Sequence, residues 1–318
     1  MPVNSLLRHV ESYSIMSSLF EVTLPLPLFG RGKVRDTYDL GDKLLIIATD
    51  RISAFDFVLP CAIPDKGLVL NQLSCFWFEK TKHIVPNHLI EPVDSVDALR
   101  HYVPTDIVLP DYLIGRSMLT LKAKLIPAEC VVRGYLSGSA WAEYREAGTI
   151  SGVSTPKGLQ ESQELSQPMF TPTTKAESGH DEPLSKQELE DLVGKATAQD
   201  LEEKSLAIYQ YAREYAQSRG IIIADTKFEF GFIDDKLILI DEILTPDSSR
   251  FWDTSQYSVG CSQPSFDKQP VRDWLAASGW NKQPPAPELP LEVIEATTHR
   301  YREAFHLLTE RSLRSVPS

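Results

Sequence analysis

The stretch Ile221-Ile-Ile-Ala-Asp-Thr-Lys-Phe-Glu-Phe-Gly-Phe-Ile-Asp-Asp-Lys-Leu-Ile-Leu-Ile-Asp-Glu242 decides the fold. Ile221–Ala224 is an apolar run that continues into Asp225–Phe230, and Leu237–Ile240 is a second apolar run beyond a turn near Asp234. Two such runs joined by a turn predict an antiparallel hairpin. Hairpins of this kind, mixed with helical stretches elsewhere in the chain, predict an α+β fold rather than a doubly wound parallel sheet.

Charged side chains gather on one face of this hairpin. Asp225, Lys227 and Glu229 alternate along the strand and therefore share a face. A three-residue loop would set Asp241 opposite Glu229, whereas a two-residue loop would shift the pairing by one. Two carboxylates so placed suit Mg²⁺, which takes few protein ligands and completes its shell with phosphates and water. The alternative is a salt-bridged edge strand without a metal.

Outward from the hairpin, the chain alternates strands and helices. We expect strands at Lys33–Tyr38, Lys43–Ala48, Leu119–Leu125 and Glu129–Val132. We expect helices at Asn71–His83, at Ser139–Ala147 before Gly148, from the capping box at Ser185 to about Arg219, at Val271–Ala277 and at Leu291–Arg311. Val153–Pro183 lacks periodicity and reads as a long loop, as does the chain from Asp241 through Asp253, while 281–290 is a proline-rich linker.

Composition excludes several classes of protein. The 318 residues carry a net charge of -12, which argues against a general nucleic-acid binder. No apolar run approaches the roughly 20 residues that span a bilayer, so we expect no membrane partner. The four cysteines form no CxxC pair, which predicts reduced thiols and, with no secretory segment apparent, a cytoplasmic protein.

Several motifs supply cations for anionic ligands. Gly30-Arg-Gly-Lys-Val-Arg35 combines a flexible backbone with Lys33 and Arg35 on one strand face, which suits a polyphosphate, although a solvated basic strand would look the same. Arg133 ends an apolar strand before a Gly/Ser loop, and Ser139 opens the next helix, where amides bind anions. An arginine on a turn is the alternative.

Three further motifs are less specific. Thr245-Pro-Asp-Ser-Ser-Arg250 is either a turn or a grip on a phosphate or carboxylate by Arg250 and a serine. Ala48-Thr-Asp-Arg-Ile-Ser53 alternates charges and hydroxyls at a strand end, and Lys268 with Arg272 begins a helix that is more often a solvated face. Together the motifs favour an ATP-dependent ligase or kinase with Mg²⁺.

The segments GKVRDTYDL, ATDRISAFD, ECVVRGYLSGSAWAEY, FTPTTKAESGHDE, IIIADTKFEFG and DEILTPDSSRFWD resemble the SAICAR synthetase family, and the fungal single-function form most of all. The match runs from about Phe29 to Trp280. It implies an ATP-grasp or kinase-like fold with a β-rich nucleotide-binding lobe (21–120), an α/β substrate and metal-binding lobe (121–280) and a linker with a C-terminal helix (281–318).

The resemblance also implies roles for individual residues. ATP would meet Gly32, Lys33 and Arg35 at its phosphates and Lys122 and Glu129 at a hinge, with Mg²⁺ on Glu229 and Asp241. The carboxyaminoimidazole ribonucleotide would meet Arg133, Ser139, Ser249 and Arg250, while Asp225, Lys227 and Asp247 line the reaction centre. L-Aspartate would be placed by Asp50, Arg51 and Ser53, with Lys268 and Arg272.

The implied reaction is a two-step acyl transfer through an acyl phosphate, in which Mg²⁺ and Lys33 neutralise the charge on the transferring group. The segment Val153–Pro183, with Lys175 and His180, is the candidate lid that excludes water. A small-molecule kinase on the same scaffold is the alternative enzyme, and a non-catalytic nucleotide-binding regulator is the alternative from another class.

Overall fold

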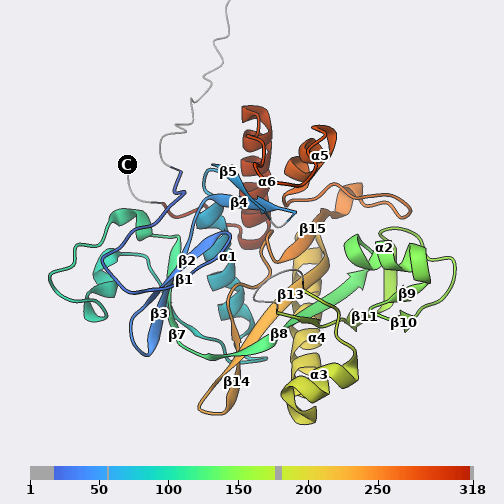
Figure 1. Ribbon diagram of the computed structural model, residues 1–318, viewed down its shortest axis with the longest axis horizontal. Coiled ribbons are helices and arrows are strands. Elements are labelled where there is room, and N and C mark those ends of the chain that lie inside the picture. The colour runs from blue at the N-terminus through green and yellow to red at the C-terminus, as the bar shows by residue number, and fades with distance from the viewer. Residues whose placement is uncertain (1–17, 56, 176–180, 316–318) are drawn as a thin grey trace, which may run out of the picture.

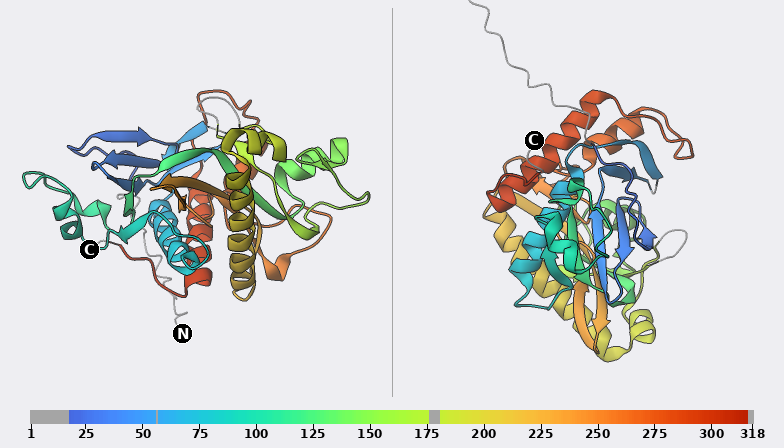
Figure 2. Two further views of the ribbon diagram at one scale, coloured as in Figure 1. Left: turned by 90° about the horizontal axis from the view of Figure 1, so that it is seen from below. Right: turned by 90° about the vertical axis from the view of Figure 1, so that its left-hand side faces the viewer.

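The computed structural model describes residues 18–55, 57–175 and 181–315. Two antiparallel sheets lie side by side (Figure 1). Helices α1 (Lys66–Thr81), α4 (Lys195–Gln217) and α6 (Leu291–Thr309) pack against one side of them, as the left view of Figure 2 shows. This mixture of helices and antiparallel sheets agrees with the predicted α+β class. Within the described ranges, no helix is both long and apolar enough to cross a membrane.

The first sheet is built mainly from the N-terminal third of the chain. Its strands are, in spatial order, β1 (Leu28–Arg31), β2 (Arg35–Asp39), β3 (Lys43–Ala48), β7 (Ser117–Leu121) and β6 (Leu89–Pro92). The 3₁₀ turns Val96–His101 and Asp111–Leu113 lie between β6 and β7. A separate hairpin pairs β4 (Arg51–Ala54) with β5 (Phe57–Ala62), which the sequence did not predict.

The second sheet carries the long central strand of the molecule. It runs β11 (Glu164–Phe170), β8 (Lys124–Tyr135), β13 (Ile221–Ile233) and β14 (Lys236–Ile240), with β12 (Thr173–Thr174) on β8 and β15 (Ser249–Asp253) on β13. A small hairpin joins β9 (Thr149–Ile150) to β10 (Val153–Ser154). The remaining helices are α2 (Gly138–Ala147), α3 (Lys186–Val193), α5 (Gln269–Ala277) and the 3₁₀ turn Thr254–Gln256.

Helix α4 (Lys195–Gln217) covers the second sheet because its apolar residues recur at helical spacing. Leu201, Ile208 and Ala212 are fully buried against β13 and β8. The Tyr209 hydroxyl donates to the Ile223 carbonyl at 2.7 Å. A Cβ at Gly134 would lie 1.9 Å from that hydroxyl oxygen, so only glycine fits there.

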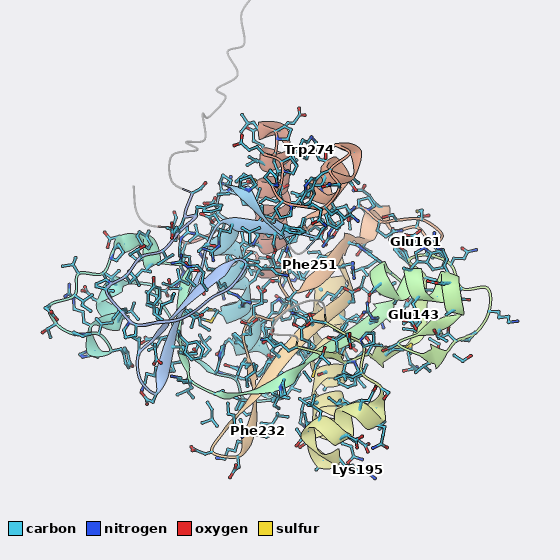
Figure 3. All side chains as sticks on the ribbon, in the orientation of Figure 1. Glu143, Glu161, Lys195, Phe232, Phe251 and Trp274 are labelled. Atoms are coloured by element: carbon cyan, nitrogen blue, oxygen red, sulfur yellow. The ribbon has the colours of Figure 1, made fainter. Side chains whose placement is uncertain are left out.

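Helices α1 (Lys66–Thr81) and α6 (Leu291–Thr309) pack on each other and share one core with both sheets. Trp77 of α1 and Phe251 of β15 are buried in this core, and Figure 3 places Phe251 near the centre of the molecule. Helix α1 begins five residues before its predicted start. It is buried on several faces, and this burial masks the amphipathic period that marks a helix start.

Four predictions about secondary structure were wrong. The helix expected from Ser185 to about Arg219 is interrupted at Gly194, whose φ is 85°, and is therefore the two helices α3 and α4. The predicted strand Leu119–Leu125 is two strands, because the chain crosses from β7 to β8 at 122–123 and thereby changes sheets. The segment 153–183 contains β10, β11 and β12 instead of a structureless loop, and its residues 176–180, including His180, lie outside the described part. The expected loop before Asp253 ends in β15, whose pairing with β13 is a long-range contact that leaves no local signature.

The hairpin loop between β13 and β14 has two residues. Asp234 and Asp235 have φ of 48° and 59°, the pair of left-handed conformations that a tight two-residue turn requires. Glu229 therefore faces Ile240, and Asp241 lies one residue beyond the strand. The three-residue register was the wrong alternative, and the two-residue register is correct.

Candidate active site

Strand β13 presents its charged residues on the face of the sheet opposite to α4. Asp225 lies across from Arg133 of β8, and Glu229 lies across from Glu129. Residues directly opposite in an antiparallel pair point to the same side. The ammonium of Lys227 lies between the carboxylates of Glu129 and Glu229. It contacts Glu129 and lies 3.8 Å from Glu229. The residues predicted to bind Mg²⁺ and those predicted to bind the ribonucleotide therefore lie on one face of the sheet.

An acidic cluster lies at the end of this face nearest the first sheet. Glu229 contacts the ammonium of Lys175, and the carboxylate of Asp241 accepts from Arg35 Nη2 at 2.7 Å. Burial and the nearby Asp241 raise the pKa of Glu229. Burial acts the same way on Asp241, but Arg35, Lys175 and Lys227 outweigh it and lower the pKa of Asp241.

The acidic cluster offers a hard-cation site only as a pair. Among residues 18–55, 57–175 and 181–315, no three His, Cys, Asp or Glu side chains form a metal-binding group. Glu229 and Asp241 nevertheless supply the carboxylate oxygens that Mg²⁺ prefers, and Mg²⁺ commonly uses one or two protein carboxylates with phosphate and water. The donor set thus fits a magnesium ion that arrives with a polyphosphate.

A cavity of about 230 Å³ lies at the other end of the same face. It brings together eight sequence-predicted residues, namely Arg133, Ser139, Asp225, Lys227, Asp247, Ser249, Arg250 and Arg272. A second cavity of about 290 Å³ shares Arg250 and Arg272 with it. A larger hollow of about 1020 Å³, between α1, β6 and the end of α6, contains none of the predicted residues.

Two arginines of the cavity, Arg133 and Arg250, are held by one buried carboxylate. Asp225 accepts from Ser137 at 3.3 Å and lies 3.5 Å from Arg133 Nη1, and Arg250 also contacts it. Arg133 additionally donates to the Ser139 hydroxyl at 3.3 Å. Two guanidinium groups around one carboxylate leave a surplus of positive charge, which suits an anionic ligand.

The glycine-rich motif forms the hairpin loop between β1 and β2, and Lys33 lies exposed in that loop. Arg51 makes five hydrogen bonds beneath it: to the carbonyls of Lys33 (3.1 Å), Gly32 (3.0 Å) and Phe20 (2.9 Å), and to both carboxylate oxygens of Asp36 (2.7 and 3.3 Å). A guanidinium has five N–H groups, so these bonds use all of them. In this arrangement Arg51 positions the loop and has no donor left for L-aspartate.

Asp50 is fully buried and has a similar structural task. Its carboxylate accepts from the amides of Leu19 at 2.7 Å and Gly67 at 2.9 Å, and it lies 3.1 Å from Arg116 Nη1. Ser53 is half-buried on β4. None of these three residues lines the 230 Å³ cavity. Their predicted contact with L-aspartate therefore finds no support in the geometry.

Lys122 and Glu129 lie in different surroundings, although the resemblance placed both at a nucleotide hinge. Lys122 is in the crossing between the sheets, where its ammonium lies 2.6 Å from Asp39 and 4.9 Å from the centre of the Phe29 ring. Glu129 lies opposite Glu229 of the acidic cluster and contacts Lys227. Of the two residues, Lys122 is the one that lies in the crossing between the sheets.

Asp247 lines the cavity, and three donors surround its carboxylate. Its carboxylate accepts from Lys66 Nζ at 2.8 Å and the Tyr301 hydroxyl at 2.6 Å, and Lys268 Nζ lies at 3.3 Å. Burial alone would raise the pKa of Asp247, but Lys268 and Lys66 hold it well below the usual range. Asp247 therefore stays ionised. Arg272 lies 3.5 Å from the neighbouring Asp267.

Comparison with known proteins assigns the chain to a family. A family model described as SAICAR synthetase matches residues 28–287. A phosphoribosylaminoimidazole-succinocarboxamide synthase of Thermodesulfovibrio yellowstonii is 54% identical over 282 residues, covering 89% of this chain and 95% of the relative. The one from Maridesulfovibrio salexigens is 52% identical over 291 residues, covering 91% and 95%. The chain belongs to the SAICAR synthetase family.

Solved structures agree with this assignment. A SAICAR-synthase from Saccharomyces cerevisiae complexed with SAICAR has a TM-score of 0.85 and 43% identity, covering 93% of this chain and 99% of that one. A SAICAR synthetase in complex with ADP has a TM-score of 0.65 at 22% identity, covering 90% and 99%, a likeness of fold alone. The chain is accordingly an ATP-dependent ligase of purine biosynthesis, and the kinase alternative is not favoured. The yeast protein is 43% identical and the two bacterial relatives are 54% and 52% identical, so the expectation that the fungal form is the most similar is not borne out.

Sequence reasoning missed two residues of this SAICAR synthetase. Lys66 and Tyr301, both fully buried, contact Asp247 directly. Lys66 follows a turn in a run of apolar residues, and Tyr301 falls on the apolar stripe of α6, so each reads as part of a helix face. Tyr301 also lies beyond the matched residues 28–287. Only the packing of α6 on α1 brings the two together.

Proposed function

We propose that the chain condenses 5-amino-1-(5-phosphoribosyl)imidazole-4-carboxylate with L-aspartate, converting ATP to ADP and phosphate. The carrying observation is the continuous face of β8 and β13, which joins a carboxylate pair suited to Mg²⁺ to an arginine-rich cavity suited to an anionic substrate. A ligase that first phosphorylates a carboxylate needs these two sites adjacent, because the γ-phosphate must reach the acceptor oxygen.

The reaction proceeds through an acyl phosphate. The imidazole carboxylate oxygen attacks the γ-phosphorus, and ADP leaves. The amine nitrogen of aspartate then attacks the acyl carbon, phosphate leaves, and the nitrogen gives up its proton as the amide forms. Bound Mg²⁺ would supply charge neutralisation at the phosphates. The protein's own residues bind the substrates, orient them and balance their charge.

In this proposal each group of residues has a task. Gly32, Lys33 and Arg35 hold the ATP phosphates, Lys122 and Glu129 flank the nucleotide, and Glu229 and Asp241 hold Mg²⁺. Arg133, Ser139, Ser249 and Arg250 bind the ribonucleotide, and Asp225, Lys227 and Asp247 line the reaction centre. Lys268 and Arg272 lie near Asp247 and favour the carboxylates of L-aspartate. Arg51 supports the glycine-rich loop from below, and Asp50 holds the amides of Leu19 and Gly67 beside Arg116.

We further propose that the two sheets divide the work, as lobes of residues 21–120 and 121–280 with 281–318 as linker and C-terminal helix. Arg35 of the first sheet meets Asp241 of the second, which would couple ATP to the metal site. A cytoplasmic location follows from the four free cysteines, because reduced thiols are typical of that compartment.

The experiment is ADP release with Mg-ATP and the carboxylated ribonucleotide, with and without L-aspartate, together with the mass of the product. We expect ADP release that depends on aspartate and a product heavier than the ribonucleotide by one aspartate minus water. Release that ignores aspartate, with a phosphorylated product, would instead establish a kinase. Omitting Mg²⁺ should abolish turnover, and unchanged turnover without any divalent cation would remove Glu229 and Asp241 from the metal site.

A further inference from the structure

The carboxylate of Asp247, in the cavity wall, has partners at both of its oxygens. Its Oδ1 accepts from the Tyr301 hydroxyl at 2.6 Å, and its Oδ2 accepts from Lys66 Nζ at 2.8 Å with Lys268 Nζ at 3.3 Å. The side chain of Asp247 is 4% exposed and that of Lys66 is 0% exposed. Asp247 thus reaches the cavity only at its edge, and everything behind it is closed.

Three different parts of the chain supply these donors. Lys66 opens α1, Lys268 precedes α5, and Tyr301 lies in the middle of α6. The Lys66 ammonium also lies 5.7 Å from the centre of the Tyr301 ring, so the cation and the aromatic ring support each other. The loop that carries Asp247 connects β14 to β15. The orientation of the Asp247 carboxylate is therefore fixed by donors at the helices, while the backbone of the loop is held to β13, where the Lys227 amide donates to the Ser248 carbonyl at 3.0 Å.

Around Asp247, three cationic and three anionic side chains lie close to one another, so their charges balance. Arg35, Lys66 and Lys268 face Asp241, Glu242 and Asp247, with Glu242 3.4 Å from Arg35 and 3.0 Å from the Thr245 hydroxyl. A buried carboxylate whose neighbours are balanced in this way keeps one orientation, because rotation would leave donors unpaired. An anchored carboxylate can orient a cationic or hydrogen-bonding group of a substrate.

We propose that Tyr301 of the C-terminal helix is a positioning residue for the ligation: with Lys66, its hydroxyl fixes the Asp247 carboxylate at the wall of the substrate cavity. The inference rests on the proposed function, in which substrates occupy that cavity. It extends the functional part of the chain into α6, beyond residues 28–287 that match the family model. Tyr301 itself is fully buried, so its hydroxyl would act through Asp247 and not on a substrate.

The test compares Tyr301→Phe with Tyr215→Phe. Both variants keep the ring and delete one hydroxyl, and the Tyr215 hydroxyl also binds α6, at the Leu308 carbonyl (3.0 Å), far from Asp247. The measurements are melting temperature and KM for each of the three substrates with kcat. Because a hydrogen bond to a charged group is lost, we expect Tyr301→Phe to lower kcat/KM for aspartate or the ribonucleotide by about tenfold or more. We expect its KM for ATP to stay within about twofold and Tyr215→Phe to match wild type.

Asp247→Asn separates the positioning proposal from the proposed function. If Asp247→Asn loses activity while Tyr301→Phe keeps the wild-type kinetics, the role of Tyr301 is overturned and the cavity assignment stands. A fully active Asp247→Asn would remove Asp247 from the site and overturn the role of Tyr301, while the ligase function itself would stand. A Tyr301→Phe variant that melts far below Tyr215→Phe and alters all three KM values equally would show a structural hydroxyl, which also overturns the proposal.

Discussion

Arg51 joins three separate pieces of the chain through one guanidinium group. It binds the carbonyls of Gly32 and Lys33 in the glycine-rich loop, the carbonyl of Phe20 before β1, and the carboxylate of Asp36 in β2. A planar fork with five donors can satisfy all of these at once, whereas an ammonium has three. The shape of the loop that we assign to ATP phosphates therefore depends on this arginine.

At the residue scale, Arg51→Lys should weaken ATP binding. Lysine keeps the charge but has only three donors for the five hydrogen bonds that Arg51 makes, so we expect KM for ATP to rise by roughly tenfold, as for the loss of one or two charged hydrogen bonds. Arg100→Lys is the control, because Arg100 is exposed and pairs only with Asp97 three residues away. Equal KM values for ATP in the two variants would contradict a positioning role for Arg51.

The residues of the candidate site differ in how far sequence could predict them. Asp225, Lys227 and Glu229 were predicted on one face because strand periodicity is local. Arg51 and Asp50 looked the same as binding residues, since a polar side chain at a strand end has the same sequence pattern whether it faces a ligand or supports a loop. Lys66 was hidden in an apolar run. Long-range packing decides these cases, and it leaves no spacing rule.

At the scale of elements, helix α2 begins against the substrate cavity. Gly138, its first residue, has φ of 57°, and a Cβ there would lie 2.3 Å from Arg250 Nη2. The absence of a side chain is what allows Arg250 to lie across the start of the helix. Glycine in the predicted Gly/Ser loop is thus needed to leave space for Arg250 as well as to form the turn.

Gly138→Ala should therefore displace Arg250 and raise KM for the ribonucleotide by about tenfold or more, as expected when a charged contact is lost. Gly148→Ala is a matched control. It has φ of 71° and would meet nothing within 4 Å, so it carries the same backbone strain without touching Arg250. Steady-state kinetics and melting curves of both variants test this. If the two variants lose affinity equally, backbone strain rather than Arg250 is responsible.

The junction between the two sheets contains His88, whose backbone binds both of them. Its amide donates to the Leu239 carbonyl at 3.0 Å, and its carbonyl accepts from Leu121 at 2.8 Å. Burial lowers the pKa of its imidazole from 6.5 to about 4. The folded protein therefore excludes the proton that the unfolded chain accepts, and stability falls as the pH drops from 6.5 towards 4.

This shift predicts a loss of about 3 kcal/mol in the free energy of unfolding across that range, present in wild type and absent in His88→Gln. Urea unfolding at pH 7 and pH 4 measures the difference. His83→Gln is the control, since His83 is exposed on the nearby end of α1. A His88→Gln variant with the wild-type pH dependence would show that other groups cause the acid sensitivity.

At the scale of the whole molecule, one apolar core spans both sheets. Ile46 and Met118 of the first sheet, Phe228 and Leu239 of the second, and Leu73 of α1 belong to the same buried cluster. The α+β class and most helices were predictable from local patterns. The way the strands divide between two sheets was not, because two runs of β-type residues on either side of a crossing look like one strand.

A shared core predicts a single cooperative unfolding transition in calorimetry. Leu73→Ala, in α1, should lower the free energy of unfolding by about 2–5 kcal/mol and move the whole transition without splitting it. The replacement of exposed Leu192 by alanine should move it little. Two resolved transitions in wild type would mean that the lobes fold independently.

The crossing at 122–123 has a mechanical consequence. Two residues span only about 7 Å, so the ends of β7 and β8 cannot separate. The bridge between Asn87 and Leu239 lies beside the crossing, because Leu121 binds the His88 carbonyl. Relative movement of the sheets is thus confined to a change of angle about this corner. An opening of that angle would part Arg35 from Asp241 and leave the pivot in place.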